Sequence, residues 1–284
     1  MTGYAHPESL VSTEWLAGHL SDPDLRVVDA TYYLPSMGKN LRAEFEAKHI
    51  PGAVLFDIDE IADRDNPLPH MLPSAEKFAS QMRKLGIGDG SRVVVYDAHG
   101  LMSATRAWWM LRIFGHGDVA LLDGGLPKWL AEGRPVEDGP AHPRERHFTA
   151  RFDHGQVRDK AQMKANLRTK REQMLDARAS PRFTGAEPDL WPGRRRGHIP
   201  GSHNLPFGDL LNPADKTLLS ADELNAKFRA AGVDLKRPII ATCGSGVTAT
   251  VLAFGLHLLG HRDVAVYDGS WAEWGLPGDT PVET

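Results

Sequence analysis

The stretch PIIATCGSGVTATVLAFGLHLLG, residues 238–260, decides how this chain is expected to fold. It begins with a short apolar run rich in β-branched residues, which is typical of a buried parallel strand. A loop with glycines on both sides of Ser245 follows. A helical pattern then begins near Val247 and stops at Gly260. A strand that leads through a tight loop into a helix is the building unit of an α/β sheet.

The first half of the chain contains the same organisation. Four of its motifs recur in the second half, in the same order and 145 to 149 positions later. The pairs are VVVYDAHG (93–100) with IIATCGSG (239–246), HIPGA (49–53) with HIPGS (198–202), LRVVDA (25–30) with EQMLDA (172–177), and VALLDGGLPKW (119–129) with VAVYDGSWAEW (264–274). A nearly constant offset indicates two homologous domains, and two copies are too few for a solenoid.

Residues 133–156, between the copies, are rich in proline, glycine and charge and lack an apolar period, as in a linker. We therefore expect domains at 1–135 and 158–284, joined by a linker at 136–157. Strands alternate with helical patterns in both halves, so the expected fold is α/β, with two tandem domains that each hold a parallel sheet with helices on both faces. Trp108 and Trp109 are expected in core and interdomain packing, and Ser220 with Glu223 has the spacing of a capping box.

Composition excludes several classes of protein. The 284 residues are 41% hydrophobic and 25% charged, as in ordinary globular proteins. The single cysteine excludes an internal disulfide and zinc sites built from several cysteines, and its free thiol fits a reducing compartment. A net charge of −4 gives no basic field for nucleic acid. Without a signal peptide or a run of about 18 apolar residues, we expect a cytoplasmic protein with no membrane partner. No motif calls for a metal or another cofactor.

The single cysteine, Cys243, stands where the expected strand ends, the edge at which ligands bind in open α/β sheets. Glycines at 244 and 246 let successive backbone N–H groups turn inward as an anion nest, and the following helix adds partial positive charge. Both features favour a thiolate, the nucleophilic form of cysteine. The sequence therefore predicts a reactive thiol with substrate-binding N–H groups on Gly244, Gly246, Val247 and Thr248.

TCGSGVTA at 242–249, together with the repeat and the HIPG motifs, resembles the tandem-domain rhodanese superfamily of sulfurtransferases. The resemblance covers nearly the whole chain. Its other features are DARASPRFTGAEP (176–188), GHIPGSHNLP (197–206), YDGSWAEW (267–274), HMLPSAEKF (70–78), VYDAHG (95–100) and ATRAWWMLRIFGH (104–116). The cysteine loop is similar to the CG[ST]GVT loop of the 3-mercaptopyruvate sulfurtransferases. Thiosulfate sulfurtransferases carry basic residues there, whereas Gly244 and Ser245 are neutral, which favours a monoanionic keto thiol.

The resemblance implies that Cys243 takes sulfane sulfur from a small-molecule donor, 3-mercaptopyruvate, as a persulfide and releases pyruvate. The sulfur would pass to a thiol acceptor such as thioredoxin, or to cyanide. Asp97 occupies the equivalent position in the first half. A carboxylate cannot carry a persulfide and would mimic the bound charge of an anion nest. The first domain is therefore expected to be non-catalytic and to act as a wall of the site.

The resemblance also implies further site residues. Ser245, His70 and Asp59 match the family's proton relay, with Asp57 as a rival for Asp59. Arg182 matches the first arginine that binds the substrate carboxylate. The second lies nine positions later in the family, but this chain has Trp191 there. The candidates to replace its charge are Arg194, Arg195 and Arg196.

Alternatives remain open at this stage. A thiosulfate sulfurtransferase shares the chemistry, and a non-catalytic persulfide carrier would share the loop. A phosphatase of the Cys-x5-Arg type is disfavoured because the sixth residue after Cys243 is Ala249. A serine hydrolase is disfavoured because Ser245 is not the centre of a G-x-S-x-G turn.

Overall fold

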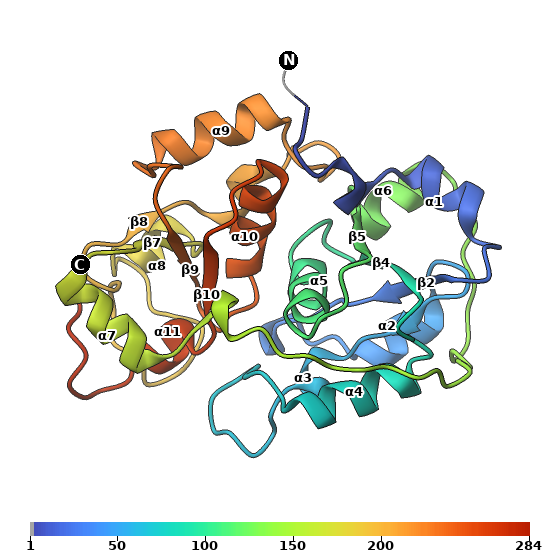
Figure 1. The fold of residues 1–284 in the computed structure, drawn as a ribbon, viewed down its shortest axis with the longest axis horizontal. Coiled ribbons are helices and arrows are strands. Elements are labelled where there is room, and N and C mark those ends of the chain that lie inside the picture. The colour runs from blue at the N-terminus through green and yellow to red at the C-terminus, as the bar shows by residue number, and fades with distance from the viewer. Residues whose placement is uncertain (1–2) are drawn as a thin grey trace.

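Two parallel sheets organise residues 3–284, the part of the chain that this computed structural model describes (Figure 1). The strand order of the first sheet is β1 (Leu10–Val11), β5 (Val119–Leu122), β4 (Arg92–Tyr96), β2 (Leu25–Asp29) and β3 (Val54–Leu55). The strand order of the second is β6 (Val157–Arg158), β10 (Val264–Tyr267), β9 (Ile239–Thr242), β7 (Gln173–Asp176) and β8 (His203–Asn204). The two orders are equivalent, so the predicted tandem repeat and fold class are confirmed.

Helices cover both faces of each sheet because successive strand residues point to opposite sides. In β4, Val93 and Val95 join one core cluster, and Val94 and Tyr96 join another. On the first sheet the faces are covered by α1 (Thr13–His19), α2 (Leu41–Ala47) and α6 (Gly125–Ala131), and by α3 (Ile58–Ile61), α4 (Ala75–Lys84) and α5 (Ala104–Ile113). On the second sheet they are covered by α7 (Lys160–Thr169) and α11 (Ser270–Trp274), and by α9 (Ala221–Ala230) and α10 (Ala249–Leu258).

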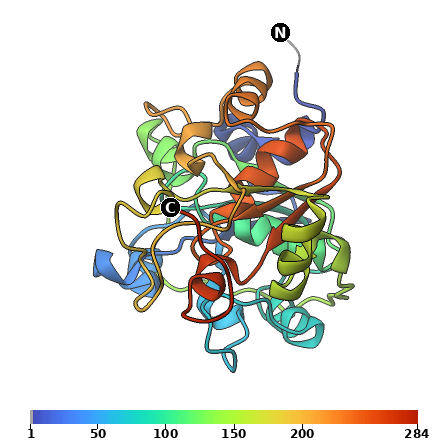
Figure 2. The same ribbon diagram turned by 90° about the vertical axis from the view of Figure 1, so that its left-hand side faces the viewer.

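The remaining regular elements are short. They are the helix α8 (Ser180–Phe183) and the 3₁₀ turns η1 (Pro7–Ser9), η2 (Pro35–Met37), η3 (His154–Gln156) and η4 (Phe207–Leu210). Figure 2 turns the second half toward the viewer and shows the orange α9 and the deep-red α11 far apart on the two sides of its sheet. The predicted capping box of Ser220 and Glu223 is present at the start of α9.

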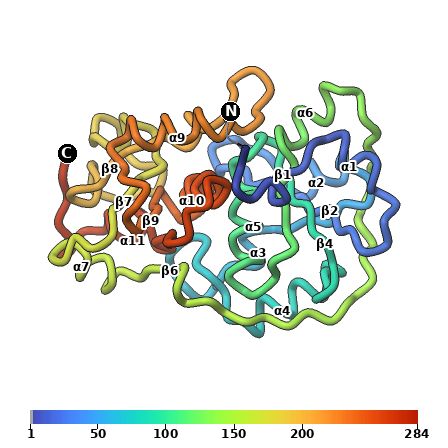
Figure 3. The backbone as a smooth tube through the Cα atoms, turned by 45° about the horizontal axis from the view of Figure 1, so that its top comes forward, coloured from blue at the N-terminus to red at the C-terminus, as the bar shows by residue number. Residues whose placement is uncertain are grey.

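One hydrophobic core runs through both halves. Helices α5 and α10 meet at its centre (Figure 3). Trp108 and Trp109 on α5 are 3% and 2% exposed, and Trp108 packs edge-on against Phe254 of α10. The hydroxyls of Thr105 and Thr250 lie 2.8 Å apart between the helices. The expectation that these tryptophans serve core and interdomain packing is therefore confirmed.

The repeated HIPG motifs have a structural role. The ring of His49 stacks on Phe45 at 4.0 Å, and its Nδ1 lies 2.8 Å from the Phe45 carbonyl. In the second half His198 stacks on Phe183 at 3.7 Å, with Nδ1 2.9 Å from that carbonyl. Both histidines therefore fix the turns that lead into the edge strands β3 and β8.

The expected linker lies along the first half of the molecule, as the light green chain of Figure 1 shows. Within residues 132–153 the backbone forms no helix and only an isolated bridge between Glu137 and His49. Phe148 is buried in the core, and the N–H of Asp153 donates to the Ile113 carbonyl. Strand β6 begins at residue 157. Among the helices described here, none is both long and apolar enough to cross a membrane.

Candidate active site

Cys243 lies at the carboxyl end of β9, between the two halves, and is 1% exposed. Its N–H donates to Ser270 Oγ at 3.2 Å, and its carbonyl accepts from the Trp271 N–H at 2.9 Å. Ser270 is fully buried and has a left-handed backbone, with φ of 47°. Because that conformation is costly for serine, the surrounding contacts must hold it in place. The start of α11 therefore fixes the Cys243 peptide on both sides.

The loop that follows Cys243 forms the expected nest. Among residues 3–284, none provides a hydrogen-bond acceptor for the backbone N–H groups of residues 244–248. Gly246 has φ of 78°, and a Cβ at this position would lie 2.7 Å from the Asp268 carbonyl oxygen, so glycine is required. The amino end of α10 begins directly after the loop. These donors and the helix dipole are arranged to stabilise negative charge at the cysteine.

The equivalent loop of the first half shows an anion in such a nest. Asp97 is fully buried, and its carboxylate accepts from the backbone N–H groups of His99 at 2.7 Å, Ser103 at 2.8 Å and Ala104 at 2.7 Å. The prediction that this carboxylate occupies an anion nest is confirmed. The first half thus satisfies its own loop with an internal side chain.

The structure brings Ser245, His70 and Asp59 into one chain of contacts. His70 Nδ1 lies 2.9 Å from Ser245 Oγ, and Nε2 lies 3.1 Å from Asp59 Oδ1. The side chain of His70 is 1% exposed and that of Asp59 is 64% exposed. The Asp59 carboxylate lies within ion-pair distance of Nε2, and its negative charge favours a proton on that nitrogen. Nδ1 is then left to accept the Ser245 hydroxyl proton.

Local backbone geometry places His70 in this chain. Its φ of 59° is left-handed, and its ring packs edge-on against Tyr32 at 4.7 Å. Asp57, the rival of Asp59, caps α3 instead and accepts from the N–H groups of Asp59 and Glu60. The carboxylate that reaches His70 is therefore that of Asp59.

Trp191 covers the cysteine loop. Its indole Nε1 lies 3.4 Å from the position that a Cβ on Gly244 would occupy, and its ring meets His70 edge-on at 5.5 Å. The Trp191 N–H donates to Asp189, whose carboxylate also pairs with the buried Arg178 at 3.2 Å. The tryptophan is thus anchored in the position where the resemblance leads one to expect an arginine.

The candidate carboxylate-binding arginines differ in how their guanidinium groups are used. Within the described chain, Arg182 has no hydrogen-bond or ion-pair partner for its guanidinium. Arg194 donates from Nε to the Ala272 carbonyl at 2.8 Å, and the Ala272 N–H in turn donates to the carbonyl of Gly244. Arg194 therefore lies beside the cysteine loop, and one of its nitrogens, Nη2, has no hydrogen-bond partner within residues 3–284.

The other two arginines of the run lie in different surroundings. Arg195 donates to the carbonyls of Gly275, Trp274 and Thr280, which occupies its guanidinium in holding the end of the chain. Arg196 is exposed and contacts the Ala186 carbonyl at 3.3 Å. Because the donors of Arg195 are used internally, it is the weakest of the three candidates for binding a carboxylate.

Sequence reasoning missed two residues of the site, Arg106 and Asp268. Arg106 is fully buried, donates to the carbonyls of His70 at 2.6 Å and Gly246 at 3.2 Å, and pairs with Asp268 at 2.7 Å. In the sequence, Asp268 could be recognised only as the residue that matches Asp123 in the repeat. Arg106 could be recognised only as a charged residue within an apolar helical pattern. Their pairing needed the tertiary structure.

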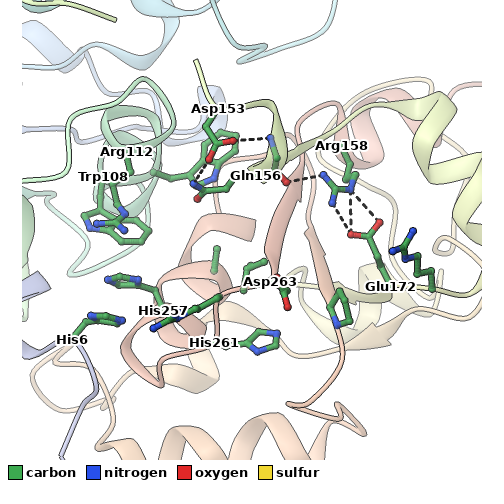
Figure 4. A pocket seen from close by; sticks show the side chains of 17 residues that line it. His6, Trp108, Arg112, Asp153, Gln156, Arg158, Glu172, His257, His261 and Asp263 are labelled. Atoms are coloured by element: carbon green, nitrogen blue, oxygen red, sulfur yellow. Dashed lines mark hydrogen bonds and ion pairs between the residues drawn. The ribbon is translucent and has the colours of Figure 1, made fainter. Parts of the chain in front are cut away.

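A cavity of about 870 Å³ opens at the amino ends of the strands of the second sheet (Figure 4). Its lining includes Glu172, Pro238 and Asp263, which precede β7, β9 and β10, whereas Cys243 follows β9. The cavity is bordered by the ion pair of Arg158 and Glu172, in which Nη2 lies 2.8 Å from Oε1. This cavity therefore lies away from the cysteine loop.

Comparisons with known proteins agree with this geometry. Residues 12–132 and 159–276 each match the family model of the rhodanese-like domain. Human 3-mercaptopyruvate sulfurtransferase is 46% identical over 94% of this chain and 91% of its own length. A thiosulfate sulfurtransferase of Cricetulus griseus is 45% identical over the same shares. The crystal structure of SseA from Escherichia coli, reported for the fold and mechanism of 3-mercaptopyruvate sulfotransferases, matches with a TM-score of 0.86 and 41% identity, over 93% of this chain and 99% of that chain.

Proposed function

This chain belongs to the family of sulfurtransferases built from rhodanese-like domains, and we propose that it transfers sulfane sulfur from 3-mercaptopyruvate through a persulfide on Cys243. The observation that carries the choice of donor is the contact chain from Ser245 through His70 to Asp59, beside a loop without side-chain cations. Such a chain can move the proton that a thiol donor must lose.

In the first step the thiolate of Cys243 attacks the thiol sulfur of 3-mercaptopyruvate. A sulfur–sulfur bond forms, and the carbon–sulfur bond of the donor breaks. Its electron pair stays on carbon, where the neighbouring ketone holds it as the enolate of pyruvate. The thiol proton moves to that carbon, so pyruvate leaves and Cys243 keeps a persulfide anion, which the N–H groups of residues 244–248 stabilise.

The proton is carried by Ser245 and His70. Ser245 takes the proton of the donor thiol while its own hydroxyl proton passes to His70 Nδ1, and the reverse transfer delivers a proton to the enolate carbon. Asp59 holds the Nε2–H tautomer and stabilises the imidazolium that forms. Because His70 comes from the first half and Ser245 from the second, the site is complete only when the two halves are packed together.

The carboxylate of the donor is bound by arginine. Arg182 has no internal partner for its guanidinium, and Arg194 lies beside the cysteine loop with one nitrogen, Nη2, unpaired in the described residues. Arginine suits this task because its planar guanidinium pairs with carboxylates through two parallel hydrogen bonds. Trp191 adds an apolar wall where the family has a second arginine.

In the second step a thiol acceptor attacks the outer sulfur of the persulfide. The Cys243 thiolate is released, and the acceptor leaves as a hydropersulfide that keeps the transferred sulfur. A dithiol protein such as thioredoxin fits this role because its second thiol can displace the sulfur as sulfide. A reducing compartment such as the cytoplasm would keep both the single thiol of this chain and such an acceptor reduced.

Thiosulfate is the second candidate donor, because one 45% identical relative is a thiosulfate sulfurtransferase. Thiosulfate is a dianion with no proton to lose, so it would gain little from the Ser245–His70 contact. The loop also lacks the cations that a dianion calls for, since Gly244 and Ser245 are neutral.

Mass spectrometry of the intact protein tests the proposed function. After incubation with 3-mercaptopyruvate and no acceptor, we expect the wild type to gain the mass of one sulfur atom and Cys243→Ser to gain none. Addition of a thiol should remove the added mass. Repeated turnover of 3-mercaptopyruvate with that thiol would distinguish an enzyme from a non-catalytic persulfide carrier. A wild type that turns over thiosulfate faster than 3-mercaptopyruvate would contradict the choice of donor.

A further inference from the structure

The two halves contact each other through equivalent residues. Asp268 of the second half accepts the Leu72 N–H of the first at 2.8 Å. Asp123 of the first half accepts the Leu218 N–H of the second, also at 2.8 Å. Thr105 and Thr250, which occupy equivalent positions in the two halves, place their hydroxyls 2.8 Å apart across the interface. The interface therefore has an approximate two-fold symmetry that relates the cysteine side to the Asp97 side.

Arg106 breaks this symmetry. The residue 145 positions later in the second half is Val251, which is fully buried in the core. Asp268 consequently has a guanidinium 2.7 Å away, whereas no cation pairs directly with Asp123 in the described residues. The buried guanidinium of Arg106 thus lies on the side of the interface that holds the cysteine.

The contacts of Arg106 join the two parts of the proton relay. Nη2 donates to the carbonyl of His70, whose imidazole receives the proton, and Nη1 donates to the carbonyl of Gly246, which directly follows Ser245. The carboxylate of Asp268 holds the same guanidinium. One rigid, planar group therefore sets the separation between the backbone of His70 and the backbone of the cysteine loop.

Burying this guanidinium is costly, and the cost calls for a reason. A buried ion pair often adds nothing to stability compared with apolar side chains of the same volume, and Val251 shows that an apolar residue fits the equivalent position. His70 also needs support, because its left-handed backbone is unfavourable in isolation. Fixing His70 against Ser245 accounts for both observations.

We propose that Arg106 is a positioning residue of the sulfur-transfer site, which acts from the non-catalytic half by holding His70 and the Cys243 loop at hydrogen-bonding distance. The proposal rests on the proposed function for its catalytic consequence. Arg106 touches neither the thiol nor the expected carboxylate site, so its effect is on the rate of the proton-coupled step and not on donor binding.

The test compares Arg106→Lys and Arg106→Met with the matched control Asp123→Asn, which alters the equivalent contact on the Asp97 side. Lysine can keep the ion pair with Asp268 but cannot reach both carbonyls. We expect kcat for 3-mercaptopyruvate to fall about tenfold or more in both arginine variants, with KM changed by less than about twofold. Asp123→Asn should keep the kcat of the wild type. Equal losses of kcat in all three variants, or none in Arg106→Lys, would overturn the proposal.

A double-mutant cycle separates positioning from general destabilisation. If Arg106 acts through His70, the loss of kcat caused by Arg106→Lys should be smaller in the background of His70→Ala than in the wild type, and the loss that remains reports the contact with Gly246. If it only stabilises the fold, the two losses should multiply. Circular dichroism melting curves of each variant establish that the proteins compared are folded at the assay temperature.

A donor-free measurement keeps this test separate from the proposed function. Cys243 is the only cysteine, so the rate of its alkylation by iodoacetamide can be followed against pH in the intact protein. Loss of the Gly246 contact loosens the anion nest, so we expect the alkylation profile of both Arg106 variants to move to higher pH and that of Asp123→Asn to stay in place. If the wild type transfers no sulfur but this shift is found, the function is wrong and the positioning is right. An unmoved profile in folded Arg106→Met refutes the positioning.

Discussion

His70 Nδ1 lies 2.9 Å from Ser245 Oγ, although 175 residues separate them along the chain and they belong to different halves. The contact exists because the loop before α4 and the loop before α10 meet at the carboxyl ends of two separate sheets. Ligand sites in α/β proteins gather at such strand ends. Here the second half contributes Cys243 and Ser245, and the first half contributes the imidazole of His70.

Replacement of His70 tests the relay directly. His70→Ala leaves the Ser245 hydroxyl without an acceptor, and general acid–base groups contribute factors of about 10² to 10⁴ in rate. We expect kcat for 3-mercaptopyruvate to fall within that range while Cys243 still alkylates. A kcat within about threefold of the wild type would remove His70 from the relay.

Asp59 and Asp57 form a matched pair for a second test. Asp59→Asn should lower kcat by about tenfold, less than loss of the base, because the carboxylate is 64% exposed and only orients His70. Asp57→Ala removes the cap of α3, so it should cost about 1 kcal/mol of stability and leave kcat unchanged. Steady-state rates and thermal melts of both variants check this prediction. A loss of kcat in Asp57→Ala with an unchanged kcat in Asp59→Asn would show that Asp57, and not Asp59, acts on His70.

Much of this arrangement could be predicted from the sequence, and the limits have physical causes. Continuous apolar runs rich in β-branched residues, such as Arg92–Tyr96, could be recognised as buried parallel strands, and the offset of the repeats revealed two copies. The two-residue edge strands are too short to show any period. Arg106 could not be recognised, because an arginine in an apolar helical pattern normally reaches solvent and only the packing of the two halves buries it.

Trp191 is the residue on which donor affinity should depend. Trp191→Arg places a guanidinium beside Gly244 and His70, at the position where the resemblance leads one to expect a second carboxylate-binding arginine. A partly exposed charge-assisted contact is worth about 1 kcal/mol, so we expect KM for 3-mercaptopyruvate to fall about fivefold with kcat little changed. Trp191→Phe keeps an aromatic ring against His70 and should leave KM near that of the wild type. An unchanged or raised KM in Trp191→Arg would show that the carboxylate binds elsewhere.

Asp123 should make the fold more stable in acid. Burial, opposed by the hydrogen bond from Leu218 and helped by the charge of Asp215, raises the pKa of Asp123 from 3.8 to about 6. A carboxyl with a raised folded pKa contributes stability below about pH 4 and loses it as the pH rises through 6. Asp123→Asn should therefore be about 2 kcal/mol more stable than the wild type at pH 7, with no gain at pH 4. Urea unfolding at both values measures this, and a variant less stable at pH 7 would contradict it.

His257 should produce the opposite dependence. Burial first, and then the charges of Arg112 and His6, lower its pKa from 6.5 to about 3. A histidine that is neutral when folded contributes stability above pH 6.5, and this is lost as the pH falls toward 3, because the unfolded chain binds the proton. At pH 5 the loss is about 2 kcal/mol.

His257→Gln removes the titrating group, so its melting temperature should fall less than that of the wild type between pH 7.5 and 5. His142→Gln, at an exposed linker histidine, should keep the wild-type slope; if His257→Gln keeps it too, the acid sensitivity arises elsewhere.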